Sequence, residues 1–116
     1  MSAPGEYWFE EGCWISEWWN APEDPTVSIA RARVPAGGIT RRHRLRGITE
    51  RYVILSGCGR VEVGDAAPRD VGPGDMVLIP AGAAQRIANG GGEDLVFLAV
   101  CTPRFTREAY EESGAG

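Results

Sequence analysis

The segment from Thr40 to Gly59 carries the residues whose types and spacing are best suited to chemistry. It holds His43, the single histidine of the chain, and Glu50 lies seven residues further on. An imidazole nitrogen and a carboxylate oxygen are both common ligands of Zn²⁺ and of other divalent ions. The two residues alone leave three interpretations open: a metal site, the remnant of one, or a polar edge of a sheet.

The composition limits what kind of protein can position these residues. A chain of 116 residues is long enough for one domain with a single core, which we take as residues 1–116. The 16 Gly and 8 Pro predict frequent turns and favour short strands over long helices. A formal net charge of −4 argues against a nucleic-acid partner, because such binding needs clustered cations.

The sequence shows no targeting or membrane-spanning pattern, so we expect a cytoplasmic protein without a membrane partner. The opening residues MSAPGEYWFE lack a positive region followed by an apolar one, and no apolar run approaches the roughly 18 residues of a spanning helix. Cys13, Cys58 and Cys101 are widely spaced and form neither a disulfide framework nor a zinc-knuckle pattern. We expect reduced thiols and no organic cofactor.

Alternation of apolar and polar residues, interrupted by Gly or Pro, predicts an all-β protein. In the segment 50–55 it places Glu50, Tyr52 and Ile54 on one face. The turn spacing is typical of a sandwich or barrel. Residues 106–112 predict a short helix capped by Thr106. The segments expected as strands are 13–20, 26–34, 50–55, 60–63, 75–80, 85–89 and 94–101.

Three of the four tryptophans, Trp14, Trp18 and Trp19, lie in the expected strand 13–20. So much aromatic area needs a partner surface, which is either the core of the same chain or a contact in an oligomer. The apolar segment 94–101 adds to the surface that a small barrel must bury. Since symmetric dimers are the commonest oligomers, we expect a homodimer.

Eight residues stand at the spacings of the two cupin sequence motifs, and the chain resembles a small single-domain cupin. They are Gly37, His43, Glu50 and Gly57 in the first motif, and Gly74, Pro80, Gly82 and Asn89 in the second. The resemblance implies a jelly-roll, double-stranded β-barrel. It places an N-terminal strand region at 6–34, motif 1 at 37–57 and motif 2 at 74–89.

The resemblance also implies a site inside the barrel, altered at two positions. In metal-binding cupins, two histidines and the glutamate of motif 1 converge with the histidine of motif 2. Here Leu45 replaces the second histidine and Gln85 replaces the last. The remaining candidates His43, Glu50 and Gln85 would form a weakened site for Zn, Mn, Fe, Co or Ni. A metal-free polar pocket and a purely structural hydrogen-bonded trio are the alternatives.

Two functions from different classes follow. The first is a metal-dependent isomerase, lyase or oxygenase that acts on a small polar metabolite, a sugar or an organic acid. Glu50 would then be a metal ligand or the catalytic general base. Arg41 stands two positions before His43, on the face that alternation turns inward, and would anchor the substrate, while Tyr52 would donate a hydrogen bond to it. The second is a non-catalytic small-molecule binding or sensing module, which the loss of a ligand at Leu45 favours.

Overall fold

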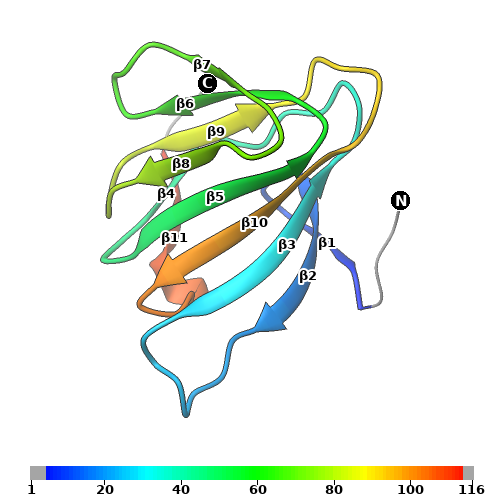
Figure 1. The fold of residues 1–116 in the computed structure, drawn as a ribbon. Coiled ribbons are helices and arrows are strands. Elements are labelled where there is room, and N and C mark those ends of the chain that lie inside the picture. The colour runs from blue at the N-terminus through cyan, green and yellow to red at the C-terminus, as the bar shows by residue number, and fades with distance from the viewer. Residues whose placement is uncertain (1–4, 114–116) are drawn as a thin grey trace.

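The computed structural model describes residues 5–113, which form two antiparallel β-sheets facing each other (Figure 1). The strands are β1 (Tyr7–Phe9), β2 (Cys13–Trp19), β3 (Ser28–Val34), β4 (His43–Leu45), β5 (Thr49–Ser56), β6 (Gly59–Val63), β7 (Arg69–Val71), β8 (Met76–Ile79), β9 (Gln85–Ala88), β10 (Leu95–Thr102) and β11 (Tyr110–Glu112). One sheet has the order β1-β2-β3-β10-β5-β8, and the other has the order β11-β4-β9-β6-β7.

The inner faces of the two sheets supply the core, because a strand turns every second side chain to the same side. On β5 the side chains of Glu50, Tyr52 and Ile54 are buried, as the alternation predicts. β10 pairs along its length with both β3 and β5, so these three strands form the centre of the larger sheet. Apolar side chains from both sheets, including Ile54, Ile87 and Phe97, fill the space between them.

The size of the inward side chains falls along the β3–β10 pair. The inward pairs along the two strands are Leu95–Val34, Phe97–Ala32, Ala99–Ala30 and Cys101–Ser28; the first two contain a large side chain, and the last two contain only small ones. Close packing fills the interior at the first end, whereas the small side chains at the other end leave room between the sheets.

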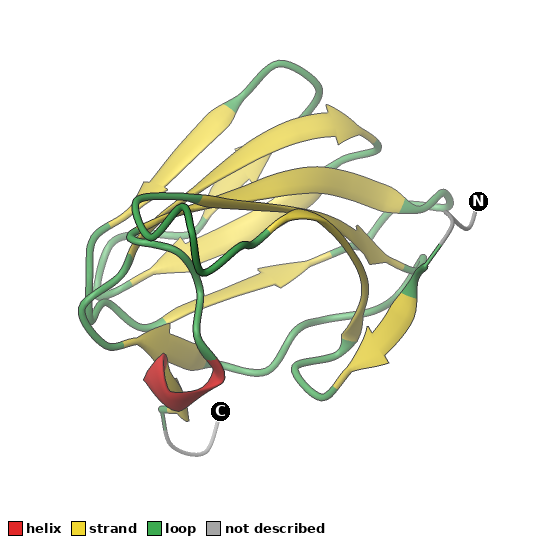
Figure 2. Ribbon diagram, turned by 90° about the horizontal axis from the view of Figure 1, so that it is seen from below, coloured by secondary structure: helices red, strands yellow, loops and turns green. Residues whose placement is uncertain are grey.

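The segments expected as strands are all present, as β2, β3, β5, β6, β8, β9 and β10. The expected segments do not include β1, β4, β7 and β11, because each has only three residues and shows too little of a pattern. The prediction of a helix over 106–112 is wrong. That segment instead holds a 3₁₀ turn, η1 (Arg107–Ala109), and Thr106 makes no side-chain capping bond to it. Pairing of β11 with β4 satisfies backbone groups that so short a helix would leave open (Figure 2).

The tryptophans of β2 lie mostly outside the core. Trp18 and Trp19 are 55% and 46% exposed, so core packing is the wrong interpretation for both. The Trp14 ring meets the Trp8 ring edge-on with a centroid distance of 5.2 Å. An oligomer contact at this surface stays a prediction. Within residues 5–113, no helix has the length and apolar character to cross a membrane.

Candidate functional site

Four buried polar side chains from the two sheets meet inside the barrel. His43 on β4 and Gln85 on β9 are Cα partners in the smaller sheet, while Glu50 and Tyr52 lie on β5 of the larger one. The Tyr52 hydroxyl donates a 2.6 Å hydrogen bond to Oε1 of Gln85. This bond bridges the sheets. Glu50 interacts with both His43 and Gln85, so the three residues that the motif resemblance selects lie together.

Glu50 is the least satisfied member of this cluster. Glu50 is 7% exposed, and its Oε1 is buried without a hydrogen-bond partner among the described residues. Burial raises the pKa of the Glu50 carboxyl to about 7, the negative charge of Glu11 adds to this rise, and His43, Gln85 and Cys101 oppose it. Glu50 therefore exchanges a proton near neutral pH and offers an open acceptor atom.

His43 is held in one orientation. Its Nδ1 lies 2.7 Å from the carbonyl oxygen of Arg41 and must donate to it, which leaves the Nε2 of the neutral ring as a lone-pair donor. The ring stacks on Tyr110 with a centroid distance of 5.0 Å. Burial lowers the pKa of His43, which favours the neutral form of the ring.

Glu11 is a site residue that the sequence analysis missed. Its Oε1 lies 3.7 Å from Nε2 of His43, and its Oε2 accepts a 3.6 Å hydrogen bond from the Cys13 thiol. Burial raises the pKa of the Glu11 carboxyl to about 7. No local pattern marks it, because Glu11 lies in the turn before β2, where the alternation of a strand does not fix the face of a side chain.

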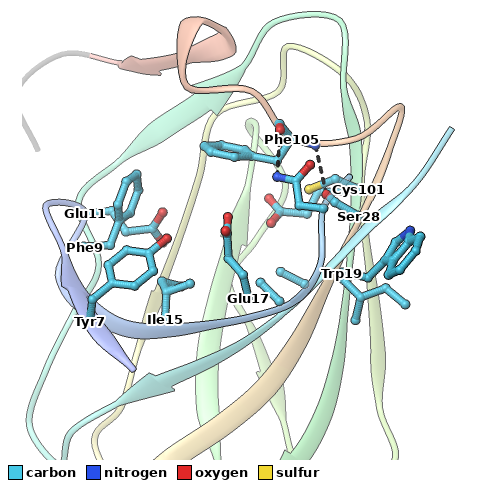
Figure 3. A pocket seen from close by; sticks show the side chains of 14 residues that line it. Tyr7, Phe9, Glu11, Ile15, Glu17, Trp19, Ser28, Cys101 and Phe105 are labelled. Atoms are coloured by element: carbon cyan, nitrogen blue, oxygen red, sulfur yellow. Dashed lines mark hydrogen bonds between the residues drawn. The ribbon is translucent and has the colours of Figure 1, made fainter. Parts of the chain in front are cut away.

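A pocket opens on the side of the cluster where the β3–β10 side chains are small (Figure 3). Its empty volume is about 490 Å³, open solvent included. Small inward residues at its base, Ala30, Ala99 and Cys101, create the space. The other linings are of two kinds: the carboxyl groups of Glu11, Glu17 and Glu50, and the aromatic rings of Tyr7, Phe9, Trp19 and Phe105. Glu50 therefore connects the buried cluster to the pocket.

The remaining predicted residues lie in different places. Tyr52 is buried and engaged by Gln85, on the core side of Glu50. Arg41 precedes β4, so alternation does not turn it inward as we expected, and its exposed side chain pairs with Glu112 at 3.0 Å. Leu45 is 3% exposed and belongs to a separate apolar cluster that also contains Cys101.

The donor atoms decide how well a metal fits. A resident divalent ion is usually held by about three or more protein ligands. The available donors are Nε2 of His43 and Oε1 of Glu50, since Oε1 of Gln85 already accepts the Tyr52 hydroxyl. Within residues 5–113, no group of three or more His, Cys, Asp or Glu side chains is arranged to hold an ion. The residues fit an ion held weakly by two side chains and water, and they do not fit a full protein ligand set.

Two facing antiparallel sheets around an interior polar cluster are typical of the jelly-roll β-barrels, a class that includes the cupins. The family model described as "Cupin domain" matches residues 30–101, which include both sequence motifs. The chain therefore belongs to the cupin family. No curated protein matches the chain.

Solved structures show the same fold in proteins of several kinds. Oxalate decarboxylase from Lactobacillus farciminis, solved as a formate complex, is 24% identical with a TM-score of 0.78. The match covers 92% of this chain but only 32% of that one, so this chain spans about a third of its length. KdgF from Halomonas sp. is 16% identical with a TM-score of 0.76, over 86% of this chain and 88% of that chain. A predicted oxalate decarboxylase from Thermotoga maritima is 27% identical with a TM-score of 0.71, over 78% and 80%.

Proposed function

We propose that the protein binds a small polar molecule in the pocket beside Glu50. The observation that carries this proposal is the open acceptor: Oε1 of Glu50 is buried, has no partner among the described residues, and belongs to a side chain that lines the pocket. A buried acceptor left without a hydrogen bond costs about 1–3 kcal/mol. A ligand that donates a hydrogen bond to this oxygen recovers that cost on binding.

Glu50 can do more than accept a hydrogen bond. A carboxyl group with a pKa of about 7 takes up and releases a proton near neutral pH, as a general base or acid must. Glu11 has the same pKa and lines the same pocket, so a second proton can be held nearby. The pocket therefore has groups that can bind a ligand and groups that can transfer a proton. The chemistry of the bound ligand decides whether a reaction follows binding. The substrate-binding roles of Arg41 and Tyr52 stay predictions.

A thermal-shift screen of small polar metabolites tests the proposal. We expect compounds that raise the Tm of the wild type to lose their effect with Ala30→Leu, because the larger side chain fills the base of the pocket. The same compounds should act less on Glu50→Gln and fully on Glu93→Gln, which removes one charge outside the pocket. Hits that are unaffected by Ala30→Leu, or a complete lack of hits, would contradict the proposal.

A second candidate function is weak binding of a divalent ion by Nε2 of His43 and Oε1 of Glu50. The observation in its favour is the hydrogen bond from Nδ1 of His43 to Arg41, which leaves Nε2 free for an ion. A bound ion would supply Lewis-acid polarisation of a substrate oxygen. Elemental analysis of protein purified without a His tag or chelator would show whether a metal is retained and which one.

Metal titration of the apo protein at about pH 7.5 and 5.5 tests the same candidate. Affinity should fall at the lower pH, because protons occupy Glu50, whose pKa is about 7, and compete for His43. His43→Ala and Glu50→Gln should abolish the signal. Equal affinity at both pH values, or binding unaffected by both substitutions, would place any ion elsewhere.

Homodimer formation and a cytoplasmic location stay predictions. Large apolar side chains that could meet a second copy are exposed on two surfaces, namely Trp8, Trp18 and Trp19 on β1–β2 and Leu55, Met76 and Leu78 on β5–β8. Sedimentation equilibrium would decide the first point, and a stable monomer at micromolar concentration would contradict it.

A further inference from the structure

We propose that the ligand of this pocket is an organic cation, specifically a protonated amine with a short apolar body. The inference rests on the proposed function, because it names the chemical class that the same pocket takes. It differs from the sugar or organic acid expected from the sequence. Three independent features of the lining carry it: charge, the open acceptor and the aromatic walls.

The charge of the lining has one sign. Glu11, Glu17 and Glu50 contribute carboxyl groups, and none of the fourteen residues that line the pocket in the described part of the chain is Arg, Lys or His. The arginines that border the region are already engaged. Arg104 donates to Oδ1 of Asn20 at 2.7 Å, and Arg107 pairs with Glu10. Among the lining residues themselves, a carboxylate or phosphate ligand would meet only like charge, whereas a cation is attracted.

The open acceptor selects among cations. Oε1 of Glu50 lacks a partner and belongs to a residue that is 7% exposed, so it is satisfied only by a group that carries a hydrogen on nitrogen or oxygen. A primary ammonium group supplies three such donors together with its charge. A quaternary ammonium supplies the charge alone and would leave the oxygen unsatisfied. The geometry therefore favours an amine over a fully methylated nitrogen.

The aromatic walls suit the remainder of such a molecule. Tyr7, Phe9, Trp19 and Phe105 line the same pocket as the carboxyl groups, and Figure 3 shows Glu17 projecting between these rings from β2. Aromatic faces attract cations and also cover apolar groups. The indole nitrogen of Trp19 donates to Asp24 at 2.9 Å, which orients this ring at the pocket edge. Phe9 already accepts the Arg107 guanidinium over its ring, at 5.3 Å from the centroid.

The test uses three probes of nearly equal shape and different charge: n-butylammonium, 1-butanol and butyrate. Each is titrated into the full chain at about pH 8, where the amine is protonated and the carboxyl groups are ionised, and binding is followed by amide chemical shifts. We expect n-butylammonium to bind about tenfold or more tightly than 1-butanol, and butyrate to bind more weakly than both. Choline, a cation without a donor on its nitrogen, should bind more weakly than n-butylammonium.

Variants separate the contribution of charge from that of the fold. Glu17 is exposed, so Glu17→Gln should leave the fold intact and weaken n-butylammonium binding about threefold or more while leaving 1-butanol unchanged. Glu93→Gln removes one charge in the loop that joins β9 and β10, away from the pocket lining, and should change neither. A smaller effect of Glu17→Gln than of Glu93→Gln would overturn the inference.

The outcomes distinguish this inference from the proposed function. If 1-butanol or butyrate binds as tightly as n-butylammonium and Ala30→Leu blocks it, the pocket binds small molecules but the cation assignment is wrong. If no probe shifts a pocket residue and the metabolite screen also yields nothing that Ala30→Leu blocks, both are wrong. Tighter binding of n-butylammonium that Ala30→Leu and Glu17→Gln both reduce supports the two together.

Discussion

The two ends of the β3–β10 strand pair differ in how well their buried polar side chains are hydrogen-bonded. At the packed end, Asn89 is 1% exposed and fully bonded: its Nδ2 donates to the carbonyl oxygens of Val34 and Glu93 at 2.9 and 2.7 Å, and its Oδ1 accepts from Gly91 at 3.0 Å. At the open end, Glu50 is nearly as buried, yet one of its oxygens has no partner among the described residues.

The difference separates a structural polar group from a functional one. Hydrogen-bonded polar groups inside a barrel stabilise one arrangement of loops, whereas an unsatisfied one lowers stability unless something binds to it. Both residues occupy cupin motif positions, so the motif does not tell the two roles apart. The contacts do, and substitutions at the two ends should have effects of different size and sign.

The largest effect is expected at the packed end, with Gly57→Ala. Gly57 has φ +78°, and a Cβ atom there would lie 2.4 Å from the backbone oxygen of Asp94. Backbone cannot move aside as a flexible side chain can, so we expect a loss of about 4 kcal/mol in the free energy of unfolding, or failure to fold. Urea denaturation measures it. Gly64→Ala, at φ +56° with open space around it, is the matched control and should cost about 1–2 kcal/mol. Equal losses of unfolding free energy in the two variants would mean that the close approach of position 57 to the backbone of Asp94 does not affect stability.

Asn89→Ala should have the next largest effect. It leaves the carbonyl oxygens of Val34 and Glu93 without their donor, and the amide of Gly91 without its acceptor, in a loop that the side chain holds together. We expect a loss of about 2–4 kcal/mol by urea denaturation, with no loss of ligand binding in protein that remains folded. A loss under about 1 kcal/mol would break the contrast between the two ends.

Glu50→Gln should have the opposite sign, and its size should depend on pH. Burial raises the pKa of Glu50 from 4.5 to about 7, so the folded state holds a proton that the unfolded state releases between these values. The stability of the wild type is therefore full below about pH 4.5 and falls as the pH rises through about 7. At about pH 8.5 the neutral amide should raise the free energy of unfolding by about 2 kcal/mol, and at about pH 5 by much less. Denaturation at the two pH values measures it, and a variant less stable than the wild type at the higher pH would refute the argument.

The smallest effect is expected from Leu45→His, which concerns metal affinity at the open end. The residue lies two positions after His43, and both side chains are buried on one face of β4. A third strong donor beside His43 should tighten binding of Zn²⁺ or Ni²⁺ about tenfold. Competition with a fluorescent chelator measures the affinity. Unchanged affinity would mean that this position does not reach the free donors of His43 and Glu50.

Much of the fold and part of the site follow from the sequence by itself. Motif spacing and alternation identify the barrel and turn Glu50 and Tyr52 inward, because a strand fixes the face of each side chain whatever its neighbours are. The same rule placed Arg41 wrongly, since this residue precedes β4 and exposes its side chain. Alternation needs a strand, and a residue outside one is not bound by it.

Only the tertiary structure decided where the pocket lies and what lines it. Glu11 approaches His43 because the turn before β2 meets the start of β4, and Phe105 reaches the same space from beyond β10. It also decided that Asn89 is satisfied while Glu50 is not, since hydrogen-bond partners of a buried group come from residues far apart in the chain. Local patterns determine which way a side chain points, but the packing of distant segments determines which groups it contacts. In this protein those contacts raise the pKa values of Glu11 and Glu50 and leave Oε1 of Glu50 without a hydrogen-bond partner among the described residues.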